Sequence, residues 1–220
     1  MIDLHTHTFF SDGELLPSEL VRRAEVAAYR VINISDHVDA SNIDLVVPRI
    51  ATVAAELTRL TPLTVLAGAE ITHVPLPQIA ELVVRARELG AQLVTVHGET
   101  LSEPVLPGTD RAAIAAGADI VAHPGLISAA DAALAAERGV CLEISARKGH
   151  CLANGHVARV ALAAGAKLVF GSDTHQHGDL VPRAQAERIL RGAGLSSEDV
   201  KAVWTHAEAL VARARSASPS

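Results

Sequence analysis

Aromatic residues are scarce in this sequence, since Phe, Tyr and Trp together make up 2% of its 220 residues. Proteins that bind single strands of nucleic acid stack the bases on aromatic rings, so a surface of that kind is not expected. Basic residues are also outnumbered, with 19 Lys and Arg against 25 Asp and Glu and a formal net charge of −6. A general electrostatic grip on nucleic acid is therefore not expected, and a nucleotide or short oligonucleotide enters only as a possible substrate.

Cysteines and long apolar runs are similarly few. The two cysteines, Cys141 and Cys151, lack CxxC spacing and fit reduced thiols better than a disulfide framework. The first residues contain no basic segment followed by an apolar one, and no apolar stretch approaches the length of a bilayer span. These absences predict a cytoplasmic protein without a membrane partner, and they leave its oligomeric state open.

Hydrophobic residues make up 49% of the chain, which is enough for one sizeable core. Short runs rich in Val, Ile and Leu predict seven strands, near 2–5, 31–35, 64–69, 92–97, 119–122, 140–144 and 168–172. Amphipathic, Ala-rich stretches predict helices near 17–29, 45–60, 77–89, 109–117, 128–138, 154–165, 181–192 and 197–214. Such regular alternation indicates an α/β fold with parallel strands joined by crossover helices.

Glycine steps punctuate this alternation, as at Gly90-Ala91 and Gly139-Val140, where a helix would end and a strand begin. They recur at roughly 22 to 27 residues, the period of one strand and its helix. The pattern favours a TIM-barrel-like fold of about seven units, although a doubly wound open sheet would give the same local signals. A single domain over residues 1–215 is predicted, with a disordered tail at 216–220.

Histidines and carboxylates follow the predicted strands at the point where each strand ends. His5 and His7 close the first strand, and alternate residues of a strand project to the same face, so both imidazoles can reach one metal ion. Further members of this series follow in chain order: Asp12, His37, Glu70, His97, His123, Asp173 and His175. Because the carboxyl ends of the strands meet at one end of a barrel, the series predicts a single convergent site.

These motifs, in this order, resemble the PHP family, the polymerase and histidinol phosphatase superfamily of metal-dependent phosphoesterases. The resemblance spans about 170 residues and is carried by His5-Thr6-His7, Ser11-Asp12-Gly13, Ser35-Asp36-His37, Gly68-Ala69-Glu70, Val96-His97-Gly98, Ala122-His123-Pro124-Gly125, Leu142-Glu143-Ile144 and Gly171-Ser172-Asp173-Thr174-His175. It implies a distorted seven-stranded (β/α)7 barrel of the small, histidinol-phosphatase-like type. Asp12 is a departure, because small members of the family can carry a histidine there.

The resemblance also implies three divalent ions at the mouth of the barrel. One ion would be bound by His5, His7, Glu70 and Asp173. The second would be bound by Glu70 as a bridge with His97 and His123, and the third by Asp12, His37 and His175. Glu70, Asp173 and His175 are expected to take part in catalysis as well.

The residue types themselves suit a phosphate ester. Three divalent ions bring a charge of +6, while Asp12, Glu70 and Asp173 supply only −3, so the centre attracts phosphate despite the acidic chain. Mixed nitrogen and oxygen ligands suit zinc, manganese or iron better than calcium or magnesium. Such ions could generate hydroxide from water near neutral pH, which would attack the phosphorus atom.

Other polar residues near the strand ends are given different roles. Asp36 is expected to cap a turn, and Glu143 to orient a histidine or coordinate weakly. Arg147 and Lys148, after the sixth strand, are expected to bind substrate phosphate, or else to be solvated loop charges. His73 and His177 lie near enough in sequence to reach the site, His150 has no assigned role, and Glu99, Glu103, His156 and His206 are interpreted as loop or structural residues.

The leading hypothesis is a phosphatase acting on a small phosphomonoester, with histidinol phosphate as one candidate. A phosphodiesterase or exonuclease acting on nucleotides or oligonucleotide ends is the alternative within the same chemistry. A barrel that has lost its metals and serves as a noncatalytic scaffold is the alternative outside it. Intact ligand types at all nine positions argue against the scaffold.

Overall fold

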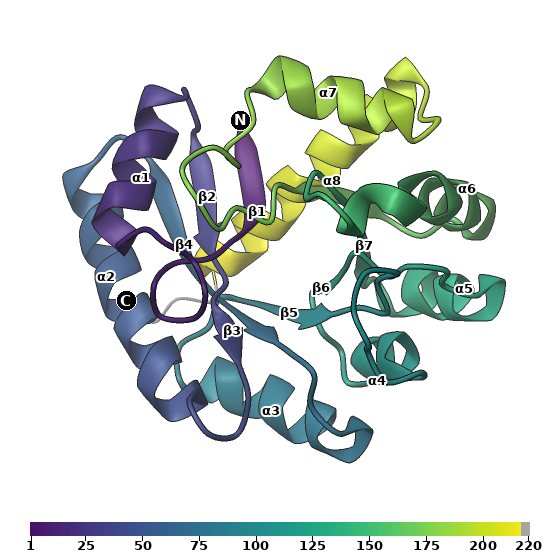
Figure 1. The fold of residues 1–220 in the computed structure, drawn as a ribbon, viewed down its shortest axis with the longest axis horizontal. Coiled ribbons are helices and arrows are strands. Elements are labelled where there is room, and N and C mark those ends of the chain that lie inside the picture. The colour runs from purple at the N-terminus through teal and green to yellow at the C-terminus, as the bar shows by residue number, and fades with distance from the viewer. Residues whose placement is uncertain (217–220) are drawn as a thin grey trace.

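Seven parallel strands form a nearly closed barrel in the computed structural model, which describes residues 1–216 (Figure 1). In order around the barrel they are β1 (Ile2–Thr6), β2 (Val31–Ile34), β4 (Thr64–Ile71), β5 (Leu93–His97), β6 (Ile120–Ala122), β7 (Cys141–Ser145) and β8 (Leu168–Gly171). The first and last strands meet where His5 and His7 exchange backbone hydrogen bonds with Asp173 and Thr174. The predicted seven-stranded α/β barrel is confirmed.

A two-residue strand, β3 (His37–Val38), was not predicted and pairs with the end of β4. It begins after a break at Asp36, whose side chain turns away to accept hydrogen bonds from Thr8 and Ser11. The pairing sets His37 beside Glu70 in the strand register. A strand this short carries no periodic signal, which is why the sequence alone did not indicate it.

Helices surround the barrel and largely match the predicted ranges (Figure 1). They are α1 (Pro17–Val26), α2 (Ile43–Leu60), α3 (Leu76–Glu88), α4 (Thr109–Ala115), α5 (Ala129–Arg138), α6 (Asn154–Ala164), α7 (Arg183–Gly192) and α8 (Ser197–Ser216), with a short 3₁₀ helix η1 (His150–Ala153). Gly139 and Gly165 end α5 and α6 in the left-handed conformation, as the glycine pattern predicted. The last helix includes Ser216, where a tail was predicted, and residues 217–220 lie outside the described part.

The last helix, α8, closes one end of the barrel and runs behind it in Figure 1. Its Leu210 and Val211 belong to a separate apolar cluster with residues near the starts of the strands. These strand residues are Ile2, Leu4, Val31, Leu66, Leu93, Ile120, Cys141 and Val169. The amino ends of the strands are therefore sealed by apolar packing, which leaves the carboxyl ends for polar chemistry.

Side chains two residues apart share one face of a strand, and along that face the barrel interior changes from apolar to polar. In β4 the series runs from Leu66 through Gly68 to Glu70, and all three positions are buried. A Cβ atom at Gly68 would lie 2.5 Å from the side-chain nitrogen of Asn33, so the middle layer has no spare volume.

Across residues 1–216, no helix is both long and apolar enough to cross a membrane.

Candidate metal centre

The structure brings all nine predicted ligands together at the carboxyl ends of the strands. They form overlapping groups of three or four side chains whose ligand atoms lie within 4.8 Å of one another. His5, His7, Glu70, His97, His123, Asp173 and His175 are buried. Asp12, in the loop after β1, is the most exposed ligand, with 57% of its side chain accessible.

Glu70 lies at the middle of the centre. Its Oε2 atom is 3.2 Å from Nε2 of His5, 3.5 Å from Nε2 of His7 and 2.9 Å from Nδ1 of His37. Its other oxygen, Oε1, is 3.8 Å from Nε2 of His123. One carboxylate thus faces histidines of all three predicted ion groups, a geometry that suits a bridging ligand.

Asp173 approaches the same space from the end of β8. Its Oδ1 atom is 3.3 Å from both Nε2 of His7 and Nδ1 of His175, and its Oδ2 atom is 3.7 Å from Nε2 of His123. The backbone of Asp173 has a φ of 56°, a left-handed conformation that is uncommon outside glycine. Backbone strain of this kind persists where the surrounding structure enforces it, and it is frequent at functional sites.

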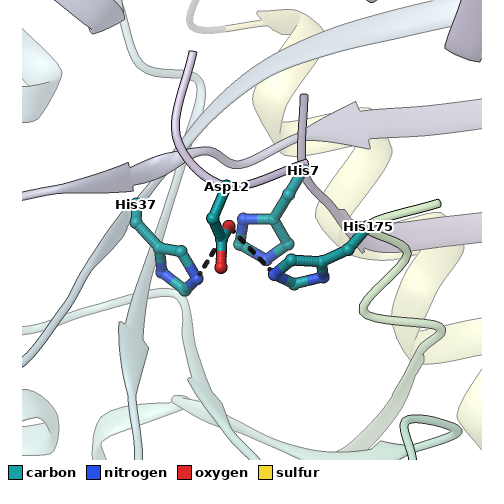
Figure 2. A group of neighbouring side chains, drawn as sticks. All are labelled: His7, Asp12, His37 and His175. Carbon is teal, nitrogen blue, oxygen red and sulfur yellow. Dashed lines mark ion pairs between the residues drawn. The ribbon is translucent and has the colours of Figure 1, made fainter. Parts of the chain in front are cut away.

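The predicted third group is also assembled, and His7 joins it (Figure 2). Asp12 Oδ1 lies 3.0 Å from Nε2 of His175 and 3.5 Å from Nε2 of His37. In Figure 2 the two imidazoles flank the carboxylate, with the ring of His7 behind them. Four side chains from three separate segments of the chain therefore converge on one small volume.

Charge in the centre favours the protonation states that bind cations. Burial alone would raise the pKa of Glu70, but the charges of His5 and His37 outweigh burial and hold its pKa well below the usual range. For Asp173, His5 and His7 similarly overcome burial and lower the pKa. Burial lowers the pKa of His7 to about 3 and that of His123 well below its usual value. These are ionised carboxylates and neutral imidazoles, the forms that coordinate metals.

His5 and His37 differ, because nearby carboxylates overcome burial and raise the pKa of both rings, which shows the surplus of negative charge. For His5, the carboxylates of Glu143, Glu70 and Asp173 raise the pKa well above its ordinary value. Three carboxylates around one ring favour a positive charge there, whether it comes from a proton or from a metal ion. A bound cation would replace that proton and satisfy the same carboxylates.

Several atoms of the centre have no hydrogen-bond partner among residues 1–216. These atoms are His5 Nε2, both ring nitrogens of His7, both carboxylate oxygens of Glu70 and His123 Nδ1. A buried polar atom left unpaired costs about 1–3 kcal/mol, so such a concentration calls for a ligand. Divalent cations fit this donor set, because it consists of imidazole nitrogens and carboxylate oxygens.

Two carboxylates outside the ligand set hold the centre in place. Glu143 Oε2 lies 2.7 Å from Nδ1 of His5, as expected for a residue that orients a histidine. Asp36 accepts hydrogen bonds from the backbone and hydroxyl of Thr8, each at 2.7 Å, and from the Ser11 hydroxyl at 2.7 Å. The predicted turn-capping role of Asp36 is thus what the structure shows, and it fixes the loop that carries Asp12.

The predicted phosphate-binding pair separates in the structure. Arg147 lies at the rim, where its Nη1 atom donates to the backbone oxygen of Asp173 at 3.2 Å and its Nε atom is 3.8 Å from Asp173 Oδ2. Lys148 is exposed, and no contact within residues 1–216 ties its side chain to the centre. Phosphate binding by Arg147 and by Lys148 stays a prediction.

The remaining histidines differ in their distance from the centre. His73 reaches the rim through Glu103, at 3.0 Å, whereas His177 is exposed and lines a surface hollow with Arg22 and Arg23 of α1. His156 and His206 contact backbone oxygens of Ile127 and Leu168, in keeping with structural roles.

Sequence reasoning gave no role to two residues that the structure places at the centre. His150 forms a group with His97 and His123, and Glu103 forms another with His73 and His97. His150 was detectable in principle, because it lies in a loop that follows a strand, as the predicted ligands do. Glu103 was interpreted as an ordinary loop carboxylate, and its place depends on how the loop after β5 folds back.

The fold and the site together define a (β/α)7 barrel with a candidate multi-metal centre at the carboxyl ends of its strands. The chain is 41% identical over 206 residues to the uncharacterized protein MJ1295 of Methanocaldococcus jannaschii, covering 93% of this chain and 94% of that protein. It belongs to the same family as MJ1295. No family model matches the sequence.

Two solved structures share the fold. A histidinol phosphate phosphatase from Lactococcus lactis, complexed with zinc, L-histidinol and phosphate, matches with a TM-score of 0.58 and 17% identity, covering 89% of this chain and 94% of that one. A chain in the structure of archaeal ribonuclease P with mature tRNA matches with a TM-score of 0.66 and 15% identity, covering 94% and 90%. At this level of identity the likeness shows the barrel fold alone.

Proposed function

We propose that this protein is a metal-dependent hydrolase of phosphate esters that acts on a small phosphomonoester. The observation that supports it most strongly is the convergence of nine predicted ligands, seven of them buried, into one cluster whose central atoms have no hydrogen-bond partner within the described residues. The likeness to a phosphatase complexed with zinc, L-histidinol and phosphate makes histidinol phosphate one candidate substrate.

Three divalent ions, of zinc, manganese or iron, are proposed for the centre. The ligand assignment is the one that the family resemblance implies, and it is supported by five overlapping groups of close side chains that include all nine proposed ligands. Bound ions of this type act as Lewis acids that lower the pKa of water and offset the charge of the phosphoryl oxygens. The described residues would hold the ions through buried imidazoles and carboxylates.

Catalytic and substrate-binding roles are proposed for separate side chains. Glu70, Asp173 and His175 are the proposed catalytic residues because each touches ligands of more than one group. Arg147, with 31% of its side chain accessible beside Asp173, would bind phosphoryl oxygens through its guanidinium group. The exposed ammonium of Lys148 would add a second positive charge to the same rim.

Phosphodiester hydrolysis at a nucleotide or oligonucleotide end is the second candidate, and the likeness to a ribonuclease P chain favours it. The net charge of −6 and the scarcity of aromatic residues weigh against a long nucleic acid. A noncatalytic scaffold would have no need of nine ligand side chains. A small phosphorylated substrate and a cytoplasmic location belong to the same proposal.

The test is a substrate panel run on protein purified without metal and then supplied with zinc, manganese or iron(II) in turn. The panel contains phosphomonoesters, phosphodiesters and a dipeptide, because two-metal sites also serve peptide hydrolysis. Phosphomonoester turnover is expected to be fastest, and His97→Ala and Asp173→Ala should each lower kcat/KM by at least about 100-fold. The matched control is His206→Ala on α8, which should leave kcat/KM unchanged. Full activity in both site variants would overturn the proposal.

A further inference from the structure

His150 is a buried histidine that the nine-ligand set omits. It lies at the start of η1, in the loop that follows β7, and its side chain is 5% accessible. Its ring stacks on that of His123, with centroids 4.0 Å apart, and meets the ring of His97 at 5.7 Å. Each of the three residues offers a ligand nitrogen within 4.8 Å of the other two.

A hydrogen bond determines which nitrogen of His150 faces the centre. Its Nδ1 atom lies 2.8 Å from the hydroxyl of Thr100, which also orients the ring. Its Nε2 atom faces carboxylates instead, at 3.4 Å from Glu103 Oε1 and 3.9 Å from Asp173 Oδ2. Metal-binding histidines have this arrangement, with one nitrogen held by a neighbouring oxygen and the other directed at the ion.

The backbone also fixes His150 in this position. The preceding residue, Gly149, has a φ of 93°, and a Cβ atom there would lie 3.1 Å from the Cβ atom of Ser102. The loop after β7 is thus packed closely against the loop after β5, which carries Thr100. A rigid histidine with a directed nitrogen needs little reorganisation to bind an ion.

The geometry points to His150 as a tenth ligand, which completes the coordination of the second ion together with His97 and His123. This inference rests on the proposed function, because it assumes that the centre holds metal. It adds a third imidazole to the ligands of that ion. The second ion would then have a predominantly imidazole environment, which favours zinc or iron over magnesium.

The test counts ions and measures their affinities by competition with a chelator. Cobalt(II) and zinc are titrated into metal-free wild-type protein, His150→Gln, Thr100→Val and the matched control His206→Gln. His150→Gln is expected to lose one ion or to bind it about 10–100-fold more weakly, while the other ions keep their affinities. Thr100→Val should lower the affinity for the same ion by a smaller factor while leaving His150 in the sequence. This variant therefore tests the inference if His150→Gln does not fold.

A spectroscopic readout distinguishes ligation from packing. In the cobalt(II) protein, the Nδ1–H proton of a coordinated His150 should give a hyperfine-shifted exchangeable NMR signal, and that signal should disappear in His150→Gln. Wild-type ion affinities in a folded His150→Gln, with the signal retained, would overturn the inference and leave the proposed function intact. A wild-type protein that binds no metal would overturn both.

Discussion

The Glu143 carboxylate lies 2.7 Å from Nδ1 of His5, and both side chains are buried. This contact occupies one ring nitrogen and turns the other, Nε2, toward Glu70 at 3.2 Å. Because a carboxylate accepts a hydrogen bond from Nδ1–H, it fixes the tautomer in which Nε2 is free to coordinate. Glu143 therefore acts on the centre through His5.

Replacing Glu143 by Gln should weaken binding of the ion that His5 holds by about 10–100-fold. The amide keeps the shape of the side chain but removes the charge that stabilises this orientation of His5. Chelator competition measures the change, with Glu56→Gln on the exposed face of α2 as the matched control. Unaltered affinity and stoichiometry would show that His5 needs no such partner.

Gly171 provides the space that the contact between Glu143 and His5 needs. A Cβ atom at this position would lie 2.5 Å from Glu143 Oε2 and 2.8 Å from Cβ of His5. Gly171→Ala should therefore lower the free energy of unfolding by about 1–3 kcal/mol and weaken metal binding as well. The control is Gly192→Ala in α7, where, among residues 1–216, no atom outside its chain neighbours and the backbone of its own helix lies within 4 Å of the added Cβ. Urea denaturation of the metal-free proteins gives the comparison, and equal losses in the two variants would contradict this explanation.

Glu103 places a negative charge at the mouth of the centre. A hydrogen bond from His97 outweighs its partial burial and, with a further one from His73, lowers the pKa of this carboxyl to about 2, so it is ionised at neutral pH. Its Oε2 atom is 3.1 Å from Nε2 of His97 and 38% of the side chain is accessible, so an entering phosphate meets it. Glu103→Gln removes this negative charge and should lower the inhibition constant of inorganic phosphate, a competitive inhibitor, by about fivefold or less. The effect is small because a partly exposed charge contributes at most about 1 kcal/mol. Weaker inhibition would mean that Glu103 assists anion binding.

Asp110 makes stability depend on pH. This buried carboxyl in α4 accepts a hydrogen bond from the Glu99 backbone at 3.0 Å, and burial raises its pKa to about 8. The folded state therefore keeps a proton that the unfolded chain loses near pH 4, so the free energy of unfolding falls as pH rises from about 4 to about 8.

Asp110→Asn replaces the protonated carboxyl with a neutral group of the same shape and should flatten that decline. Urea denaturation at several pH values between 5 and 8 measures it, with the largest gain in stability over the wild type expected at pH 8. The same pH slope in both proteins would mean that Asp110 is already ionised in the folded state.

The sequence predicted those parts of the structure that depend on local pattern and order along the chain. His5 and His7 were predicted because alternate strand residues share a face, and Asp173 because it follows the last strand of a barrel. His150 was given no role because it matches no ligand position of the family pattern, and its orientation depends on a contact with Thr100, 50 residues earlier. The packing of α8 across the strand starts was equally hidden, since an amphipathic helix does not reveal which apolar surface it covers.

Leu210 and Val211 of α8 share an apolar cluster with Ile2 and Leu4 of β1, so the last helix packs with the first strand. Closing a loop of almost the whole chain has a large entropic cost, and only the complete set of strands repays it. The apolar residues at the strand starts can therefore be fully covered only after the 20 residues of α8 have docked on them. Sealing of the end of the barrel opposite the metal centre is thereby linked to docking of α8.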